Sequence, residues 1–217
     1  MQRSFATCLF VMLAVSADVA LGDDLFPPPW RGLPFTTYSE WDFLTPTNPA
    51  PPDGGLPIVG DGGGGGPLAN MLGNLFWDPV FNGSWISGFG GGQMHFEIPN
   101  WIDNRPLKRM QVQITYQQHP LFDGINVVVA NDPTGIAGIF EDSESDIPLD
   151  PLNGLFHRTE QWRIFPNPDN ELLIMNVPVD MAITQVVVDT WSIPEPTSLL
   201  LGALASVGLL LWRRVLS

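Results

Sequence analysis

The chain has 217 residues, of which 15% are charged, and its 22 glycines and 22 prolines together make up about a fifth of it. Nine basic residues are outnumbered by 23 acidic ones, and the net charge of −14 would repel phosphate backbones, which argues against nucleic-acid binding. The density of glycine and proline also argues against a helical bundle or a parallel α/β fold.

The N-terminus has the three parts of a secretory signal peptide. Arg3 precedes an apolar run over residues 5–15, and small residues follow at positions 20 and 22. Because the run is short for a membrane span, we expect residues 1–22 to form a signal helix that is read by the Sec machinery and then removed. Cys8, the single cysteine, lies in this segment, so the mature chain has none for disulfides, thiolate catalysis or metal binding.

Residues 23–70 are expected to form a Pro/Gly-rich arm and linker. Several prolines and the run Gly62–Gly66 interrupt regular elements here, and the glycine run is expected to act as a flexible hinge. Tyr38, Trp41 and Phe43 lie among these breakers, and a free linker would lack such aromatic residues. We therefore expect these three side chains to pack on the domain that follows.

From residue 71 to 193 the hydrophobic pattern has the period of two that is typical of β-strands. Met94, Phe96 and Ile98, for example, alternate with polar residues. The predicted strands cover residues 94–98, 110–116, 125–130, 135–140, 155–165, 171–177 and 183–191. Short strands at about ten-residue spacing, without an amphipathic helix between them, predict an all-β fold, a single β-sandwich of jelly-roll type.

The C-terminus ends in an uncharged apolar segment followed by a basic pair. As a helix, residues 197–212 would span about 24 Å, which is enough to cross a locally thinned bilayer. Arg213 and Arg214 come directly after it and are expected on the cytoplasmic side. We therefore expect a C-terminal transmembrane helix, with the sandwich on the outer side of the membrane.

Residues 194–217 as a whole resemble the PEP-CTERM sorting signal of exported bacterial proteins. In that signal a Pro-Glu-Pro tripeptide, an apolar helix and a basic cluster are recognised by the membrane enzyme exosortase, and here Pro194, Glu195 and Pro196 supply the tripeptide. The resemblance implies that these residues are the substrate of exosortase. It also implies transient inner-membrane anchoring followed by a location at the cell surface or in the extracellular exopolysaccharide matrix.

The sequence lacks the common signatures of catalysis. It has no Gly-x-Ser-x-Gly elbow, no His-Glu-x-x-His and no P-loop. His95, His119 and His157 lie in separate segments and are expected to be polar strand or turn residues rather than metal ligands. Glu97 and Glu160 are the candidates for the paired carboxylates of a secreted polysaccharide hydrolase. The leading expectation is that the protein has no catalytic site.

An acidic stretch between two predicted strands is the best candidate for binding a cation. Glu141, Asp142, Glu144 and Asp146 offer carboxylate oxygens, the ligands that calcium prefers. The stretch lacks the spacing of an EF-hand loop, so a solvated acidic loop is the competing interpretation. No other cofactor is expected.

Tryptophan is abundant, with eight residues in the chain. Trp85, Trp162 and Trp191 fall in or beside strand patterns and are expected in the core. Trp77 and Trp101 have loop-like neighbours and are candidates for stacking on sugar rings. The sequence therefore predicts an exported surface or matrix protein without catalytic activity, and a carbohydrate-binding module of the exopolysaccharide matrix is the alternative.

Overall fold

The computed structural model describes residues 24–56, 66–80, 83–99, 106–118, 125–131, 138–168 and 170–193. Its strands are β1 (Thr36–Trp41), β2 (Gly54–Leu56), β3 (Leu68–Asp78), β4 (Ser84–Pro99), β5 (Leu107–Gln118), β6 (Asn126–Asn131), β7 (Gly138–Asp150), β8 (Leu155–Phe165), β9 (Asn170–Val177) and β10 (Met181–Ile193). Within these ranges the structure has strands and no helix, so the all-β prediction is confirmed. The predicted signal helix and C-terminal transmembrane helix lie outside these ranges, within which no helix could cross a membrane.

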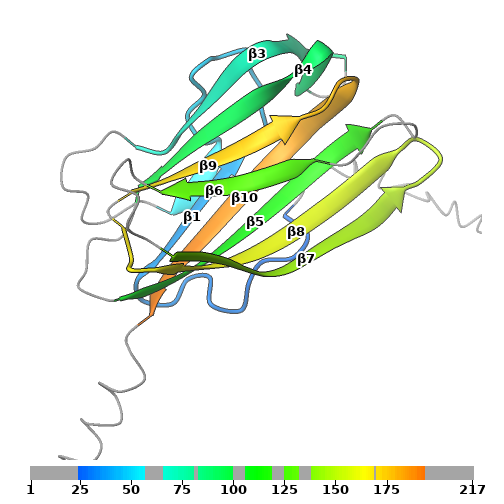
Figure 1. Ribbon diagram of the computed structural model, residues 1–217. Coiled ribbons are helices and arrows are strands. Elements are labelled where there is room, and N and C mark those ends of the chain that lie inside the picture. The colour runs from blue at the N-terminus through cyan, green and yellow to red at the C-terminus, as the bar shows by residue number, and fades with distance from the viewer. Residues whose placement is uncertain are drawn as a thin grey trace, which may run out of the picture.

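The strands form two antiparallel layers that are joined through the long strand β4 (Figure 1). One layer has the order β2-β1-β10-β5-β8-β7, and the other has the order β3-β4-β9-β6. Trp85 and Ile86 at the start of β4 pair with β10 of the first layer, whereas Gly92–Pro99 pair with β9 of the second. A sandwich-like arrangement of open sheets is therefore confirmed.

Glycines allow β4 and its partner β3 to bend between the two layers. Gly73 in β3 pairs with Gly92 in β4, and the β3–β4 register shifts immediately after Gly73. Gly91 has a φ of +72°, and a Cβ there would lie 2.7 Å from the carbonyl oxygen of Val177. Both the left-handed backbone and the close approach of β9 require glycine at this position.

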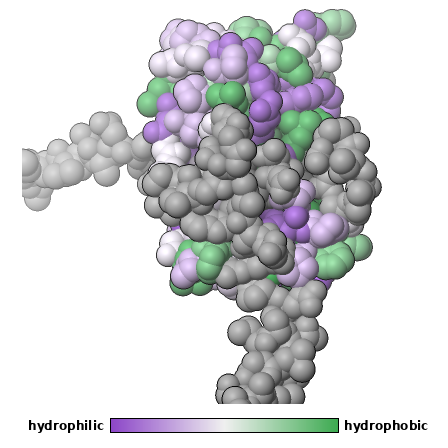
Figure 2. All heavy atoms as spheres, turned by 90° about the vertical axis from the view of Figure 1, so that its left-hand side faces the viewer, coloured by the Kyte–Doolittle hydropathy of each residue, from purple (hydrophilic) through white to green (hydrophobic). Residues whose placement is uncertain are grey.

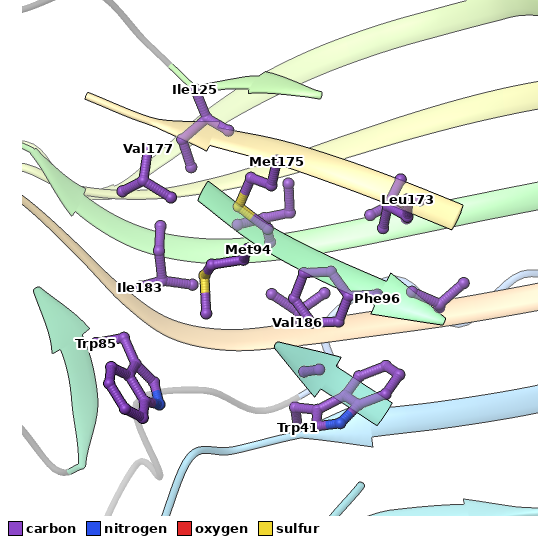
Figure 3. Close-up of a cluster of buried hydrophobic side chains, with 14 of the residues drawn as sticks. Trp41, Trp85, Met94, Phe96, Ile125, Leu173, Met175, Val177, Ile183 and Val186 are labelled. Atoms are coloured by element: carbon purple, nitrogen blue, oxygen red, sulfur yellow. The ribbon is translucent and has the colours of Figure 1, made fainter. Parts of the chain in front are cut away.

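The core fills the space between the two layers (Figure 3). Met94 and Phe96 of β4 and Leu173 of β9 are completely buried, as the period-two pattern predicts. Trp41 of β1 packs edge-to-face against Phe96, with ring centroids 5.0 Å apart. One wall of the core therefore comes from a strand near the N-terminus.

The sandwich begins earlier in the chain than the boundary at residue 71 that the sequence pattern suggests. β1 pairs along its whole length with the central strand β10, and β2 and the first residues of β3 also lie in the 23–70 segment. Trp41 and Phe43 are buried in the core. Prolines and glycines separate these short strands, which hides them from a search for alternating residues.

The acidic stretch is also a strand rather than a loop. It forms most of β7, the edge strand that pairs with β8, and the side chains of residues 140–149 are exposed. Charged side chains on an edge strand discourage pairing with another chain. The interpretation as a solvated loop was wrong in its secondary structure, because an exposed edge strand need not alternate polar with apolar residues.

Candidate functional site

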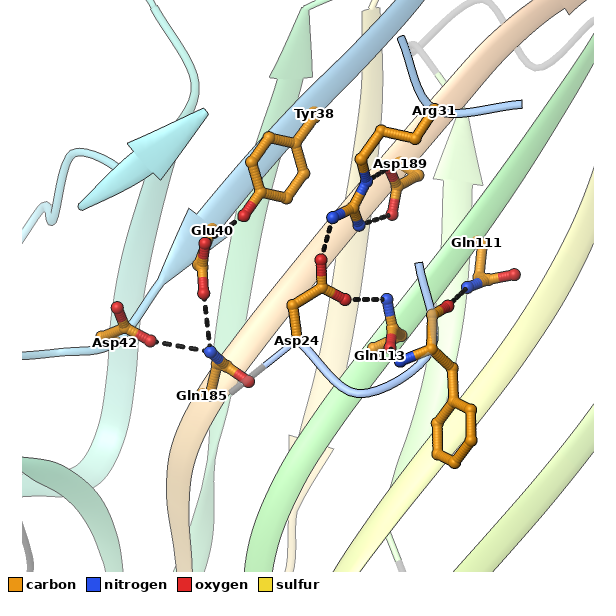
Figure 4. A network of polar contacts seen from close by, with 10 residues as sticks. Asp24, Arg31, Tyr38, Glu40, Asp42, Gln111, Gln113, Gln185 and Asp189 are labelled. Atoms are coloured by element: carbon orange, nitrogen blue, oxygen red, sulfur yellow. Dashed lines mark hydrogen bonds and ion pairs between the residues drawn. The ribbon is translucent and has the colours of Figure 1, made fainter. Parts of the chain in front are cut away.

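The segment Asp24–Leu33 lies against the outer face of the first layer and buries polar side chains there (Figure 4). Gln111 donates a 2.7 Å hydrogen bond from Nε2 to the carbonyl oxygen of Phe26. The N–H of Phe26 donates to Oε1 of Gln113 at 2.9 Å. Two glutamine side chains of β5 thus satisfy both main-chain groups of one residue, as a neighbouring strand would.

Asp24–Leu33 forms the N-terminal arm of the sandwich, and Arg31 anchors its C-terminal end. Its Nε and Nη2 donate to the two carboxylate oxygens of Asp189 in β10, at 2.6 and 2.5 Å, and Nη1 pairs with Asp24. The guanidinium lies 4.0 Å from the centre of the Tyr38 ring. Burial raises the pKa of the Asp189 carboxyl above its ordinary value, and the hydrogen bonds from Arg31 offset part of that rise.

The same face continues beside the arm as a network around Gln185 (Figure 4). Nε2 of Gln185 donates to Glu40 at 2.7 Å and to Asp42 at 2.8 Å, while the hydroxyl of Tyr38 donates to Glu40. Burial, together with the hydrogen bond to Glu40, raises the pKa of the Tyr38 hydroxyl. The hydroxyl therefore stays protonated and acts as a donor that orients the carboxylate, not as a base.

A second polar cluster surrounds Arg158 on β8. The guanidinium pairs with Glu160 at 2.5 Å, Glu144 at 2.8 Å and Asp146 at 3.0 Å, and the hydroxyl of Tyr116 donates to Asp146 at 3.1 Å. Burial raises the pKa of the Glu160 carboxyl, against the opposing effect of Arg158. One cation thus links three carboxylates across β7 and β8.

His157 is fully buried beneath the arm. Its Nδ1 shares a 3.0 Å hydrogen bond with the hydroxyl of Thr115, and its ring lies 5.3 Å from that of Phe26. Burial lowers the pKa of His157 to about 4, so the ring is neutral near pH 7. His95 is on β4, hydrogen-bonded to Gln93. His119 lies outside the described residues.

Three of the four predicted calcium ligands contact arginines. Asp142 accepts a 2.6 Å hydrogen bond from Arg163, and both Glu144 and Asp146 pair with Arg158. Glu141 is exposed on the same strand. In the part of the chain that the structure describes, no three His, Cys, Asp or Glu side chains are grouped to hold a metal ion. Calcium binding stays a prediction.

The candidate stacking and catalytic residues are dispersed. Trp77 packs against the core and donates its indole N–H to the carbonyl oxygen of Phe43 at 2.8 Å, whereas Trp101 lies outside the described residues. Glu97 is exposed in the second layer, and Glu160 is buried in the first beside Arg158. The structure does not bring these two glutamates together as an acid–base pair.

Comparisons with curated proteins and with solved structures find no match. The sequence family described as the PEP-CTERM protein-sorting motif matches residues 192–215, starting at the last two residues of β10. The matched range includes Pro194, Glu195, Pro196, Arg213 and Arg214, which lie outside the described residues. The chain therefore carries a PEP-CTERM sorting motif, which implies an exported protein that exosortase processes after transient membrane anchoring.

Proposed function

We propose that this protein is an exported β-sandwich without catalytic activity that acts at the cell surface or in the extracellular matrix after its tail is processed. The observation that carries the proposal is the sorting motif, which begins at the last two residues of β10. Its recognition residues are Pro194, Glu195 and Pro196, and the basic pair Arg213 and Arg214 completes the signal. These residues serve as a substrate for exosortase and take no part in chemistry of the sandwich.

The pairing of the ionisable groups supports a role without catalysis. Asp189 is held by Arg31, Glu160 by Arg158, and the buried Glu171 by Lys108. A general acid or base must be able to reach a substrate and exchange a proton with it. Carboxylates that already bind a cation in a buried position are poorly suited to that task, and they are well suited to holding segments of the fold together.

The sorting motif follows the sandwich without a spacer. Ile193, the last residue of β10, pairs with Leu107 of β5, and Ser192 is buried and donates its N–H to the carbonyl oxygen of Phe35 at 3.1 Å. Pro194 is the next residue. The proposal therefore has exosortase recognise its substrate close to the end of the central strand β10.

Expression in cells with and without exosortase tests the proposal. In exosortase-positive cells we expect an intact mass that lacks residues near 197–217, and in cells without the enzyme we expect the tail to be retained in the membrane fraction. Glu195→Ala should block processing, whereas Glu97→Ala, which changes an exposed glutamate on β4, should leave it unchanged. A complete tail on the protein released from exosortase-positive cells would contradict the proposal.

We also infer that the sandwich is a variant of the jelly roll. β1 pairs with β10, β4 with β9, and β5 with β8, so the chain pairs with itself as though folded in half. Nested pairing of this kind, distributed over two sheets, is what a rolled-up double Greek key produces. β7 departs from the scheme, because it stays beside β8 instead of joining β6.

A further inference from the structure

A pocket of about 610 Å³ lies at the bend of β4, away from the N-terminal arm. Its walls come from the bend itself, the neighbouring part of β3, the first residue of β6 and the end of β9. Gly73 and Gly90–Gly92, the glycines at the bend of β3 and β4, contribute only backbone to the lining. Its volume falls in the range of sites for small ligands.

Phe89, one of the residues that line the pocket, carries an aromatic ring that the fold leaves in solvent. The side chain of Phe89 is 94% exposed, although burial of a phenylalanine is strongly favourable. The backbone of Phe89 is nevertheless held, because Nδ2 of Asn74 donates a 2.7 Å hydrogen bond to its carbonyl oxygen. Gly90 and Gly91, both with positive φ, set the backbone direction that follows. Phe89 therefore offers an exposed apolar ring, and its backbone is held by a hydrogen bond.

The lining also includes a row of side-chain amides across β4, β9 and β6. Nε2 of Gln93 donates to Oδ1 of Asn176 at 2.9 Å, and Nδ2 of Asn176 donates to Oδ1 of Asn126 at 3.2 Å. Each amide nitrogen carries two hydrogens, and these bonds use one of them. The hydrogen bonds between the amides thus orient their side chains, and each amide keeps donor or acceptor capacity for a ligand.

The charge of the pocket defines the class of ligand. All of its lining side chains are uncharged, in a chain with a net charge of −14. The surrounding field repels anions, and without a carboxylate in the lining a cation has no partner. A ligand with many hydroxyl groups matches amides that both donate and accept, and its apolar ring face matches an exposed aromatic ring.

We propose that this pocket binds a neutral saccharide, with Phe89 as the stacking surface and Gln93, Asn126 and Asn176 as the hydrogen-bonding row. The site differs from the tryptophan candidates of the sequence, since Trp77 is engaged with the core and Phe43. It goes beyond the sorting role of the tail, and a failure to bind sugar would leave processing by exosortase unaffected.

Calorimetric titration of the full-length chain tests the proposal, in a detergent without a sugar headgroup. The probes are maltohexaose and cellohexaose, which are neutral, and hexagalacturonate, an acidic oligosaccharide of the same length. We expect at least one neutral hexasaccharide to bind with a Kd below about 1 mM and the acidic one to bind at least about tenfold more weakly. No binding of either neutral probe at about 10 mM, or equal binding of the acidic probe, would overturn the proposal.

Variants at exposed positions separate the site from general stability. Phe89→Ala should weaken binding by about fivefold or more, Phe89→Trp should restore or strengthen it, and Asn126→Ala should weaken it without changing the melting temperature. Phe140→Ala is the matched control, because Phe140 is also exposed but lies on β7 outside the pocket. Binding that Phe89→Ala leaves unchanged would show that the sugar binds elsewhere and would refute the assignment.

Discussion

Replacing Arg31 with alanine should release the N-terminal arm and destabilise the whole sandwich. Arg31 is the cation that neutralises Asp189, whose side chain is almost completely buried in the central strand β10. Without the guanidinium, Asp189 must either remain buried without its partner, take up a proton, or regain water by losing the arm that covers it. The third route is available because the arm is a terminal segment with no strand pairing of its own.

The structure sets the magnitude of the effect. Breaking a buried ion pair from one side costs about 3–5 kcal/mol when the remaining charge stays buried. Release of the arm instead loses what docking contributes, which is about 1 kcal/mol for each of the three hydrogen bonds to Gln111 and Gln113 and about 2 kcal/mol for burying Trp30. Because the two routes cost about the same, we expect Arg31→Ala to lower the free energy of unfolding by about 3–5 kcal/mol.

Urea denaturation followed by tryptophan fluorescence measures this loss, since Trp30 stacks on Trp191 with ring centroids 6.0 Å apart. Arg163→Ala is the matched control, because Arg163 pairs with Asp142 on the surface, with half of its side chain exposed. Such a pair contributes at most about 1 kcal/mol. Equal losses of less than about 1 kcal/mol in the two variants would refute the reasoning about the arm.

Three further predictions concern buried or strained positions. The pKa of His157 is about 4 in the folded protein, below the ordinary 6.5. Because the unfolded chain then binds the proton more readily, the free energy of unfolding should fall by at most about 3 kcal/mol as the pH drops from 6.5 to 4. In urea titrations, His157→Gln should remove this part of the pH dependence. Lys108→Met removes the buried ammonium that pairs with Glu171 and should cost about 3–5 kcal/mol. The double variant with Glu171→Met should restore most of this loss in thermal melts. Gly91→Ala should lower the melting temperature more than Gly90→Ala, because both have positive φ but only at Gly91 would a Cβ come within 2.7 Å of a backbone carbonyl; equal shifts would contradict this.

The sequence predicts the central strands well, because their side chains alternate between the core and the outer face. Met110, Val112 and Ile114 of β5 are all buried as the pattern indicates. The pattern fails for β1 and β7. β1 alternates buried with half-buried residues between proline-rich segments, and β7 exposes both faces, so neither carries the contrast from which a strand is inferred.

The polar face beneath the arm was not predictable from local pattern. Gln111 and Gln113 have the spacing of solvent-facing strand residues, and the segment that covers them lies 85 to 87 residues earlier in the chain. One signal was present. The run Val186-Val187-Val188 is apolar at consecutive positions, which indicates a strand buried on both faces and therefore a cover over its outer side.

The distribution of exposed hydrophobic residues indicates whether a surface is suited to docking a partner. Figure 2 shows that, among the coloured residues of the face it presents, hydrophobic and hydrophilic ones are intermixed. Single exposed apolar residues are ordinary on protein surfaces, whereas a docking face usually gathers them. Phe89 is therefore distinguished by the pocket it lines and not by exposure alone.

The N-terminal arm and the sorting motif both adjoin β10, so this strand links docking of the arm to processing of the tail. Arg31 and Trp30 contact Asp189 and Trp191, and the sorting motif begins at the next residue. Docking of the arm thus holds the strand whose last residue precedes Pro194 in the chain. If order at this end limits access, Arg31→Ala should speed removal of the tail in exosortase-positive cells, while Arg163→Ala should not. Pulse-labelled mass analysis measures the rate, and equal or slower processing of Arg31→Ala would mean that exosortase reads the tail independently of how firmly β10 is held.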